Sequence, residues 1–200
     1  MATDGQVLAF PGSPATDDHA LLTRCVDGDD RAIAQFVARF QADVMRFLSR
    51  MLGPTDPGLD DLVQLTFVAA LDAGHRFDGR SAIRTWLLGI AHNKVRMELR
   101  SRMRRRRAMD LLARFRLVHK PAPPDRLQAR EIGQRIQEAL LQLHPDLRAA
   151  FVLCDVNGMT AKDAAEALGV PAGTLRRRRS EAKQRLQPLL ADLRVGEDTP

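Results

Sequence analysis

Residues 74–107 read GHRFDGRSAIRTWLLGIAHNKVRMELRSRMRRRR, and the rest of the chain is organised around this stretch. It begins as a short polar loop, continues as a helical pattern with the only tryptophan, Trp86, and ends in a run of arginines. Between Lys94 and Arg107 there are eight basic residues and one acidic residue, Glu98. Such a run is either the solvated end of a helix or a surface for a polyanion. Because aromatic and basic residues share one predicted element, the pattern favours a nucleic-acid surface.

The composition predicts a folded, all-α protein. Hydrophobic residues make up 44% of the 200 residues and charged residues 28%, as in ordinary globular chains. Tyrosine is absent and aromatics are only 4%, so the core must consist of aliphatic side chains, which favours helices packed on helices. The net charge is +6, and it is concentrated in residues 94–107, as expected of a site for a polyanion.

Several classes of function lack their sequence signals. Cys25 and Cys154 form no C-x-x-C pair and are expected to be buried free thiols. The five histidines are dispersed, no glycine-rich phosphate loop occurs, and no nucleophile lies beside a base, so we expect no metal, cofactor or catalytic activity. A small metal-dependent nuclease would need a ligand cluster that the sequence does not offer. No signal sequence or long apolar run is seen, which predicts a cytoplasmic protein without membrane insertion.

The first half of the chain predicts a helical domain over residues 17–106 that follows a mobile arm, residues 1–16. A long helix capped by Asp29 or Asp30 carries a continuous apolar stripe up to Gly53. The helix after it has one apolar face and one mixed face. This mixed face suits a protein contact better than a nucleic acid, although periodicity alone favours a solvated surface. The helices are expected at about 17–26, 30–52, 59–73 and 82–105, and the mixed face is formed by Asp60, Asp61, Gln64, Leu65 and Val68.

The second half predicts a separate domain over residues 127–190, joined by a flexible linker, residues 107–126, and followed by a tail, residues 191–200. The linker contains Lys120-Pro121-Ala122-Pro123-Pro124, which no helix can cross. Later, a capping signal at Thr160 opens a short helix, Gly169 makes a tight turn, and a basic helix follows. This order is the plan of a helix-turn-helix.

The basic helix offers specific DNA contacts. Its first turns place Thr174, Arg176 and Arg177 where base edges would be read, while Arg178 and Lys183 suit phosphates. The alternative is a three-helix bundle with a solvated basic face. Arg179 falls in the apolar stripe of this helix, so it must pass along the bundle to solvent or meet an acid. We predict that Arg179→Leu stabilises the domain, and an unchanged melting temperature would mean that Arg179 has a specific partner.

Three segments together resemble the extracytoplasmic-function (ECF) class of bacterial sigma factors. They are DDLVQLTFVAAL (60–71), RFDGRSAIRTWLLGIAHN (76–93) and LGVPAGTLRRRRSEAKQRL (168–186). The resemblance covers both predicted domains, as sigma region 2 and sigma region 4. It implies an alternative sigma factor that binds core RNA polymerase, recognises promoter DNA, melts it and so permits initiation.

The resemblance also implies roles for particular residues. The mixed face would bind the clamp of core polymerase, although Leu65 stands where the family usually has Glu. The 75–81 loop would capture a flipped base of the downstream promoter element, and the basic helix would contact the melted strand. The second domain would read the upstream element, and an anti-sigma factor is an expected partner. The downstream residues are His75, Arg76, Phe77, Asp78, Arg80, Ser81, Trp86, Asn93, Arg96 and Arg100.

The chief rival is a stand-alone helix-turn-helix transcriptional regulator. Such a protein would not need a first domain with a base-capture loop and a tryptophan-bearing basic helix.

Overall fold

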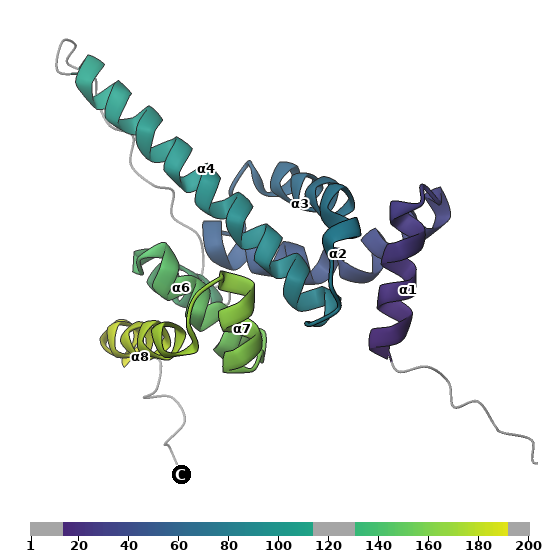
Figure 1. The fold of residues 1–200 in the computed structure, drawn as a ribbon. Coiled ribbons are helices and arrows are strands. Elements are labelled where there is room, and N and C mark those ends of the chain that lie inside the picture. The colour runs from purple at the N-terminus through teal and green to yellow at the C-terminus, as the bar shows by residue number, and fades with distance from the viewer. Residues whose placement is uncertain (1–13, 114–130, 192–200) are drawn as a thin grey trace, which may run out of the picture.

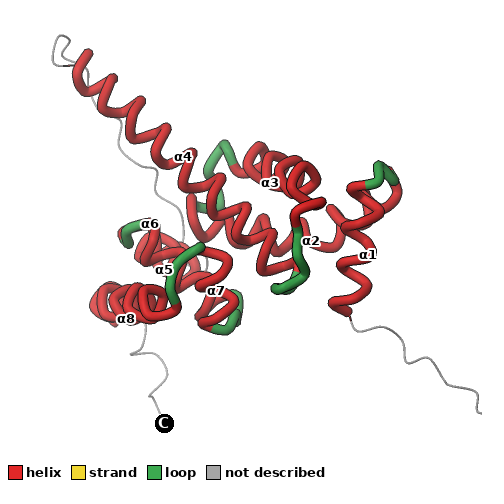
Figure 2. The backbone as a smooth tube through the Cα atoms, in the orientation of Figure 1, coloured by secondary structure: helices red, strands yellow, loops and turns green. Residues whose placement is uncertain are grey.

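A computed structural model describes residues 14–113 and 131–191, and these two ranges contain helices and no strand (Figures 1 and 2). The predicted all-α class is therefore confirmed. The helices are α1 (Pro14–Val26), α2 (Asp30–Leu52), α3 (Leu59–Ala73), α4 (Ile83–Ala113), α5 (Glu131–Gln142), α6 (Pro145–Phe151), α7 (Ala161–Leu168) and α8 (Ala172–Leu189). A 3-10 turn, η1 (Gly74–Arg76), follows α3, and a π-helical segment, η3 (Val152–Val156), continues α6.

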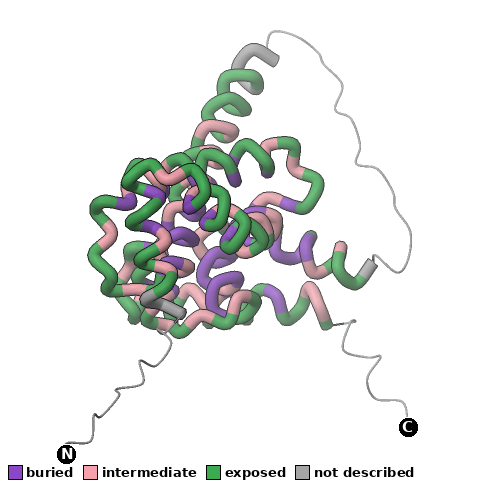
Figure 3. Tube along the Cα trace, turned by 90° about the vertical axis from the view of Figure 1, so that its right-hand side faces the viewer, coloured by how far each residue is buried: buried purple, intermediate pink, exposed green. Residues whose placement is uncertain are grey.

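The first domain packs α1, α3 and α4 around α2. The Asp29 carboxylate accepts hydrogen bonds from the main-chain N–H groups of Arg31 and Ala32, at 2.9 and 3.0 Å, so the predicted cap is present. The apolar stripe of α2 points into the core, where Phe36 and Phe47 are fully buried. The buried face of α3 is the one that periodicity indicates: Leu59, Leu62, Val63, Thr66, Phe67 and Ala70. In Figure 3, buried positions gather where the helices meet, and the outer turns are exposed.

Helix α4 is longer than expected. The sequence suggested an end near Arg105, but the helix continues to Ala113, so the predicted linker does not begin at 107. Residues 108–113 are good helix formers for the most part and contain neither Gly nor Pro, which explains the extension. The C-terminal part of α4 extends beyond the other helices (Figure 1).

The second domain contains the expected helix-turn-helix. Thr160 Oγ1 accepts a hydrogen bond from the N–H of Asp163 at 3.1 Å and opens α7. Gly169 adopts a left-handed φ of 62°, which ends α7 and allows the turn into α8. Leu175, Ala182 and Leu186 attach α8 to the domain core.

The two domains pack against each other, which the sequence did not indicate. A Cβ atom added to Gly89 of α4 would lie 2.8 Å from the main-chain oxygen of Ala167 in α7, so only glycine fits this contact. Gln137 Nε2 donates to the Arg50 oxygen at 3.2 Å, and the Arg148 guanidinium donates to the Met51 oxygen. The buried residues of the two domains form one continuous hydrophobic core. We call this contact the interdomain interface.

Three predicted segments lie largely outside the described residues. Of the arm, only residues 14–16 are described, and they belong to α1. Of the linker, residues 107–113 belong to α4, and residues 114–126 are outside the described ranges, as are residues 192–200 of the tail. None of the described helices combines the length and apolar character that crossing a membrane requires.

Candidate nucleic-acid interface

The 75–81 loop presents polar groups around one anchored aromatic ring. Phe77 is half-buried, and its ring lies 5.1 Å from that of Trp86, centroid to centroid, at a tilt of 51°. Beyond Phe77, the Asp78 carboxylate accepts the Arg80 N–H at 3.1 Å, and Gly79 adopts a φ of 71° that reverses the chain. The side chains of His75, Arg76, Asp78 and Arg80 are exposed, and Ser81 is half-buried. The Phe77 ring thus anchors the loop to α4, and the other side chains of the loop are polar.

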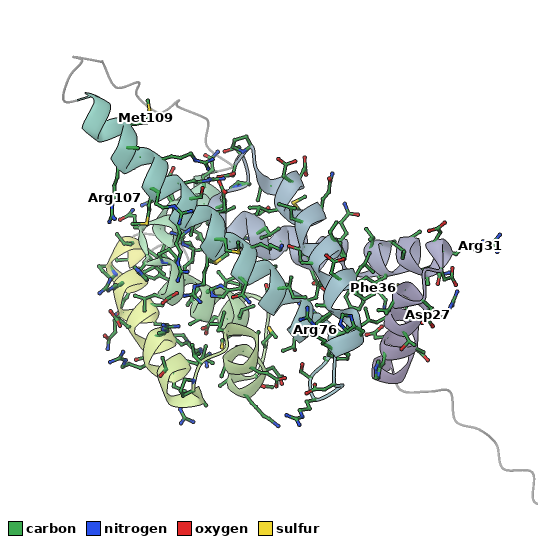
Figure 4. The ribbon with its side chains drawn as sticks, turned by 45° about the horizontal axis from the view of Figure 1, so that its top comes forward. Asp27, Arg31, Phe36, Arg76, Arg107 and Met109 are labelled. Carbon is green, nitrogen blue, oxygen red and sulfur yellow. The ribbon has the colours of Figure 1, made fainter. Side chains whose placement is uncertain are left out.

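One side of α4 continues from this loop. Trp86, Asn93 and Arg100 are spaced by seven residues and therefore share a helix face. Asn93 and Arg100 are exposed, while Arg96, toward the second domain, is half-buried. Figure 4 shows Arg76 near one end of α4 and Arg107 near the other, so the loop and the arginine run bracket the helix. The structure thus places Trp86, Asn93 and Arg100 on the side of α4 that continues from the loop, whereas Arg96 lies off this face.

Not every arginine of this helix is available for a ligand. Arg102 Nη2 lies 2.8 Å from Asp56 Oδ1, and Arg102 Nε lies 2.6 Å from Glu98 Oε1. The Arg102 hydrogen bonds lower the pKa of Asp56 below its ordinary value. Arg84 makes a similar bidentate contact to Asp43 at 2.9 and 3.1 Å. These two arginines hold the fold together, whereas Arg100, Arg104, Arg106 and Arg107 are exposed.

In α8, the predicted base-reading and phosphate residues have different surroundings. Arg176 and Arg177 are exposed and Thr174 is half-buried, so the first turns of the helix face outward as expected. Arg178, however, pairs with Asp146 at 2.8 Å, and Lys183 pairs with Asp155 at 2.7 Å. Both cations are therefore already paired with an acid in this structure. These pairings could not be predicted from local patterns, because the acids lie on α6 and η3 and are distant in the chain.

Arg179 meets an acid, which was one of its two expected fates. Its Nε and Nη2 atoms both lie 2.8 Å from the Asp155 carboxylate. This contact raises the pKa of Arg179 and lowers that of Asp155. Arg179 is therefore partnered, and the reason for expecting Arg179→Leu to stabilise the domain no longer holds.

The mixed face of α3 lies open on the surface. Asp60, Asp61 and Gln64 are exposed, and Leu65 and Val68 retain 48% and 55% of their accessible surface. Two neighbouring exposed aliphatic side chains beside acids fit a protein contact better than a nucleic-acid contact.

Other chemistry finds little support in the described residues. Cys25 and Cys154 are buried free thiols, and burial raises the pKa of each. Within residues 14–113 and 131–191, no three His, Cys, Asp or Glu side chains converge as the ligands of a metal ion would.

The fold and these surfaces define a two-domain helical DNA-binding protein, with an anchored loop and basic helix in one domain and a helix-turn-helix in the other. Comparisons with known proteins agree. Residues 36–105 match the model of the Sigma-70 region 2 family, and residues 133–186 match that of the Sigma-70, region 4, family.

Curated relatives match along nearly their whole length. The ECF RNA polymerase sigma-E factor of Haemophilus influenzae is 30% identical over 185 residues, covering 86% of this chain and 97% of the relative. The ECF RNA polymerase sigma factor SigC of Mycobacterium tuberculosis is 34% identical over 189 residues, covering 89% and 94%.

Two solved structures are similar in fold. CnrH in complex with the cytosolic domain of CnrY has a TM-score of 0.63 and 30% identity, covering 88% of this chain and 97% of the other. The sigma factor RpoE in complex with the anti-sigma factor NepR, from Bartonella quintana, has a TM-score of 0.58 and 28% identity, covering 79% and 96%. The chain belongs to the ECF family of RNA polymerase sigma factors. It is an alternative sigma factor that directs promoter recognition, and the rival of a stand-alone regulator is not favoured.

Proposed function

We propose that the two domains divide promoter recognition between the 75–81 loop with α4, which take the melted downstream element, and α8, which reads the upstream element in the duplex. The proposed role of the 75–81 loop rests on the contact of Phe77 with Trp86 beneath a loop of exposed polar groups. From here on we call residues 75–81 the capture loop.

Capture of a flipped base is chemically plausible at this loop. Removing a base from the stack costs a few kcal/mol, which hydrogen bonds to the base edge and stacking on aromatic or guanidinium planes can offset. Asp78 offers acceptors, Arg76 and Arg80 offer donors, and all three are exposed. Asn93 and Arg100 lie on the same side and would hold the strand that leaves the loop.

The helix-turn-helix supplies the other contact. In such motifs the N-terminal turns of the second helix approach base edges in the major groove, and in α8 these turns hold Thr174, Arg176 and Arg177. Arg178 directly follows Arg177, Lys183 lies further along the helix, and both would contact phosphates after leaving Asp146 and Asp155.

The exposed mixed face of α3 is the proposed site for core polymerase. Leu65 and Val68 would be buried in the contact, with Asp60, Asp61 and Gln64 around them. A further proposed partner is an anti-sigma factor, because the similar structures of CnrH and RpoE were solved in complex with CnrY and with the anti-sigma factor NepR. We also propose that the protein acts in the cytoplasm and has no catalytic activity of its own.

The test is transcription of a randomised promoter library by purified core polymerase, with and without the protein, followed by sequencing of the RNA 5′ ends. Specific initiation should depend on the protein. Phe77→Ala should change the selected downstream bases, and Arg177→Ala the upstream bases. Asp61→Arg should abolish both by preventing assembly, and Arg31→Ala, an exposed change on α2, should do nothing. Identical base preferences in the Phe77 and Arg177 variants would refute the proposed division.

A further inference from the structure

Helix α1 supplies a third ring to the aromatic contact under the capture loop. His19 lies edge-to-face on Phe77, with ring centroids 5.4 Å apart and planes at 90°. Phe77 therefore contacts both the imidazole of His19 and the indole of Trp86. The three rings come from α1, the capture loop and α4, so this contact joins α1 to two segments that are distant from it in the sequence.

The backbone of the loop also follows α1. A Cβ atom at Gly79 would lie 3.7 Å from His19 Cε1, at the tip of the loop. At the other end, a Cβ atom at Gly74 would lie 2.5 Å from Val26 Cγ2, too close to be tolerated without movement. Glycine at position 74 therefore lets the start of the loop lie directly against α1, whereas at Gly79 the distance to His19 is that of an ordinary van der Waals contact.

Helix α1 is itself fixed at this point. Asp18, adjacent to His19, pairs with Arg39 of α2 at 2.7 Å, and Leu22 is buried one turn later. The imidazole is exposed, so it packs on Phe77 with one edge while it remains hydrated on the other side. His19 can therefore position the loop although it is not part of the hydrophobic core.

We propose that His19 is a positioning residue for the capture loop. Its ring keeps Phe77 against Trp86, and the turn from Asp78 to Arg80 is thereby presented in one arrangement before DNA arrives. A loop that is ordered in advance loses less conformational entropy when it binds, which raises affinity for the flipped base. This inference rests on the proposed function of the loop as the site of base capture.

The experiment compares promoter opening by holoenzymes that contain His19→Ala, His19→Phe or the unchanged protein, on a duplex promoter from the library and on the same promoter melted in advance. One edge-to-face ring pair corresponds to a roughly three- to tenfold effect on an equilibrium. We expect His19→Ala to reduce opening of the duplex about that much and to weaken binding of the downstream single strand similarly. His19→Phe, which retains a ring, should restore most of both. Affinity for core polymerase should not change.

A second measurement uses the free protein. Trp86 is the only tryptophan in the chain, so its fluorescence reports on the packing of Phe77. His19→Ala should make Trp86 more accessible to a quencher such as acrylamide. Thr23→Ala is the matched control: this exposed α1 side chain donates only to the His19 main-chain oxygen, at 3.0 Å, and should leave quenching unchanged.

The outcomes separate two failures. If Phe77→Ala impairs opening but His19→Ala does not, the positioning role is overturned while the function of the loop stands. If neither substitution affects opening, both proposals fail. Equal losses in stability, polymerase binding and opening for His19→Ala, without recovery in His19→Phe, would make His19 an ordinary structural residue and would also overturn the inference.

Discussion

The guanidinium of Arg148 donates a hydrogen bond to the main-chain oxygen of Met51, so a side chain of the second domain completes the last turn of a helix in the first. The same group donates to the oxygens of Leu141 and Leu143, at 2.8 and 3.0 Å, at the end of α5. Arg148 is only 5% exposed, and burial lowers its pKa to about 10. The partial negative charges at two helix C-termini therefore take the place of a carboxylate.

Removing the Arg148 guanidinium should destabilise the protein. Arg148→Met fills similar space but leaves the oxygens of Met51, Leu141 and Leu143 without this donor, and an unsatisfied buried polar group costs about 1–3 kcal/mol. We expect urea denaturation to show a loss of about 2–4 kcal/mol in the free energy of unfolding. Arg177→Met, an exposed change on α8, is the control and should cost little. Equal stabilities of the two variants would mean that Arg148 is not needed at the interface.

The interdomain interface should open when Gly89 is replaced. In Gly89→Ala the new Cβ atom would lie 2.8 Å from the Ala167 oxygen, while the α4 helix itself gains about 1 kcal/mol from the better helix former. We therefore expect unchanged helicity by circular dichroism and a larger radius of gyration by small-angle X-ray scattering. Gly133→Ala is matched to it, because a Cβ atom at Gly133 meets nothing within 4 Å. A compact Gly89→Ala variant would show that the contact can adjust.

The protein should lose stability as the pH falls below neutrality, because of His92. Burial, followed by the charge of Arg96, lowers the pKa of His92 from 6.5 to about 4. The unfolded chain therefore binds a proton at a higher pH than the folded chain does. The contribution of neutral His92 to the free energy of unfolding is fully present above about pH 6.5. It is lost as the pH falls toward 4, by a total on the order of 3 kcal/mol.

Thermal unfolding of the His92 variant tests this expectation. The ring packs against Phe47, with centroids 6.5 Å apart, and Asp146 and Arg178 of the second domain are also electrostatic neighbours. His92→Phe should flatten the dependence of the melting temperature on pH between 7 and about 5, above the range in which the paired carboxylates titrate. A variant that keeps the full slope would assign the pH dependence to another group.

The arginines in the protruding C-terminal part of α4 should determine how DNA binding responds to salt. Each phosphate contact that is lost reduces the slope of log K against log salt by about 0.7–0.9. Replacing Arg104, Arg105, Arg106 and Arg107 by Gln should weaken binding on all promoter sequences and reduce this slope by about 2–4.

Altering Phe77, Asp78 or Arg80 in the capture loop should instead affect promoter opening or base preference while polymerase binding is retained. The single variants Arg31→Gln and Arg107→Gln each remove one positive charge, so a comparison of their salt slopes separates the effect of position from the effect of net charge. Identical behaviour of the loop and arginine variants would show that residues 74–107 act only as a general basic patch.

Local patterns predicted the helices and their faces well, because the period of apolar residues directly reflects burial. The buried and exposed faces of α3, the Asp29 cap and the turn at Gly169 were all expected and are all present. The end of α4 was placed too early because a dense run of like charges resembles a boundary, although arginine is itself a good helix former.

Contacts between distant segments could not be predicted from the sequence. Nothing local distinguishes Arg148 from the exposed Arg177, or Arg102 from Arg100, because each depends on a partner from elsewhere in the chain. Gly89 lies inside a helix, and only its close approach to Ala167 explains why glycine is needed there. His19 likewise gave no sign of the Phe77 ring that it contacts.

The far end of α4 extends past the rest of the molecule, and this affects how the protein finds DNA as well as how tightly it holds it (Figure 4). Charges on a protruding helix are surrounded by water, so their field extends about 8 Å before physiological salt screens it. An approaching strand would meet these arginines before it reaches the compact body. Attraction at that distance can raise association rates by about 10- to 1,000-fold. The protruding helix thus makes the speed of the search, and not only its end point, depend on ionic strength.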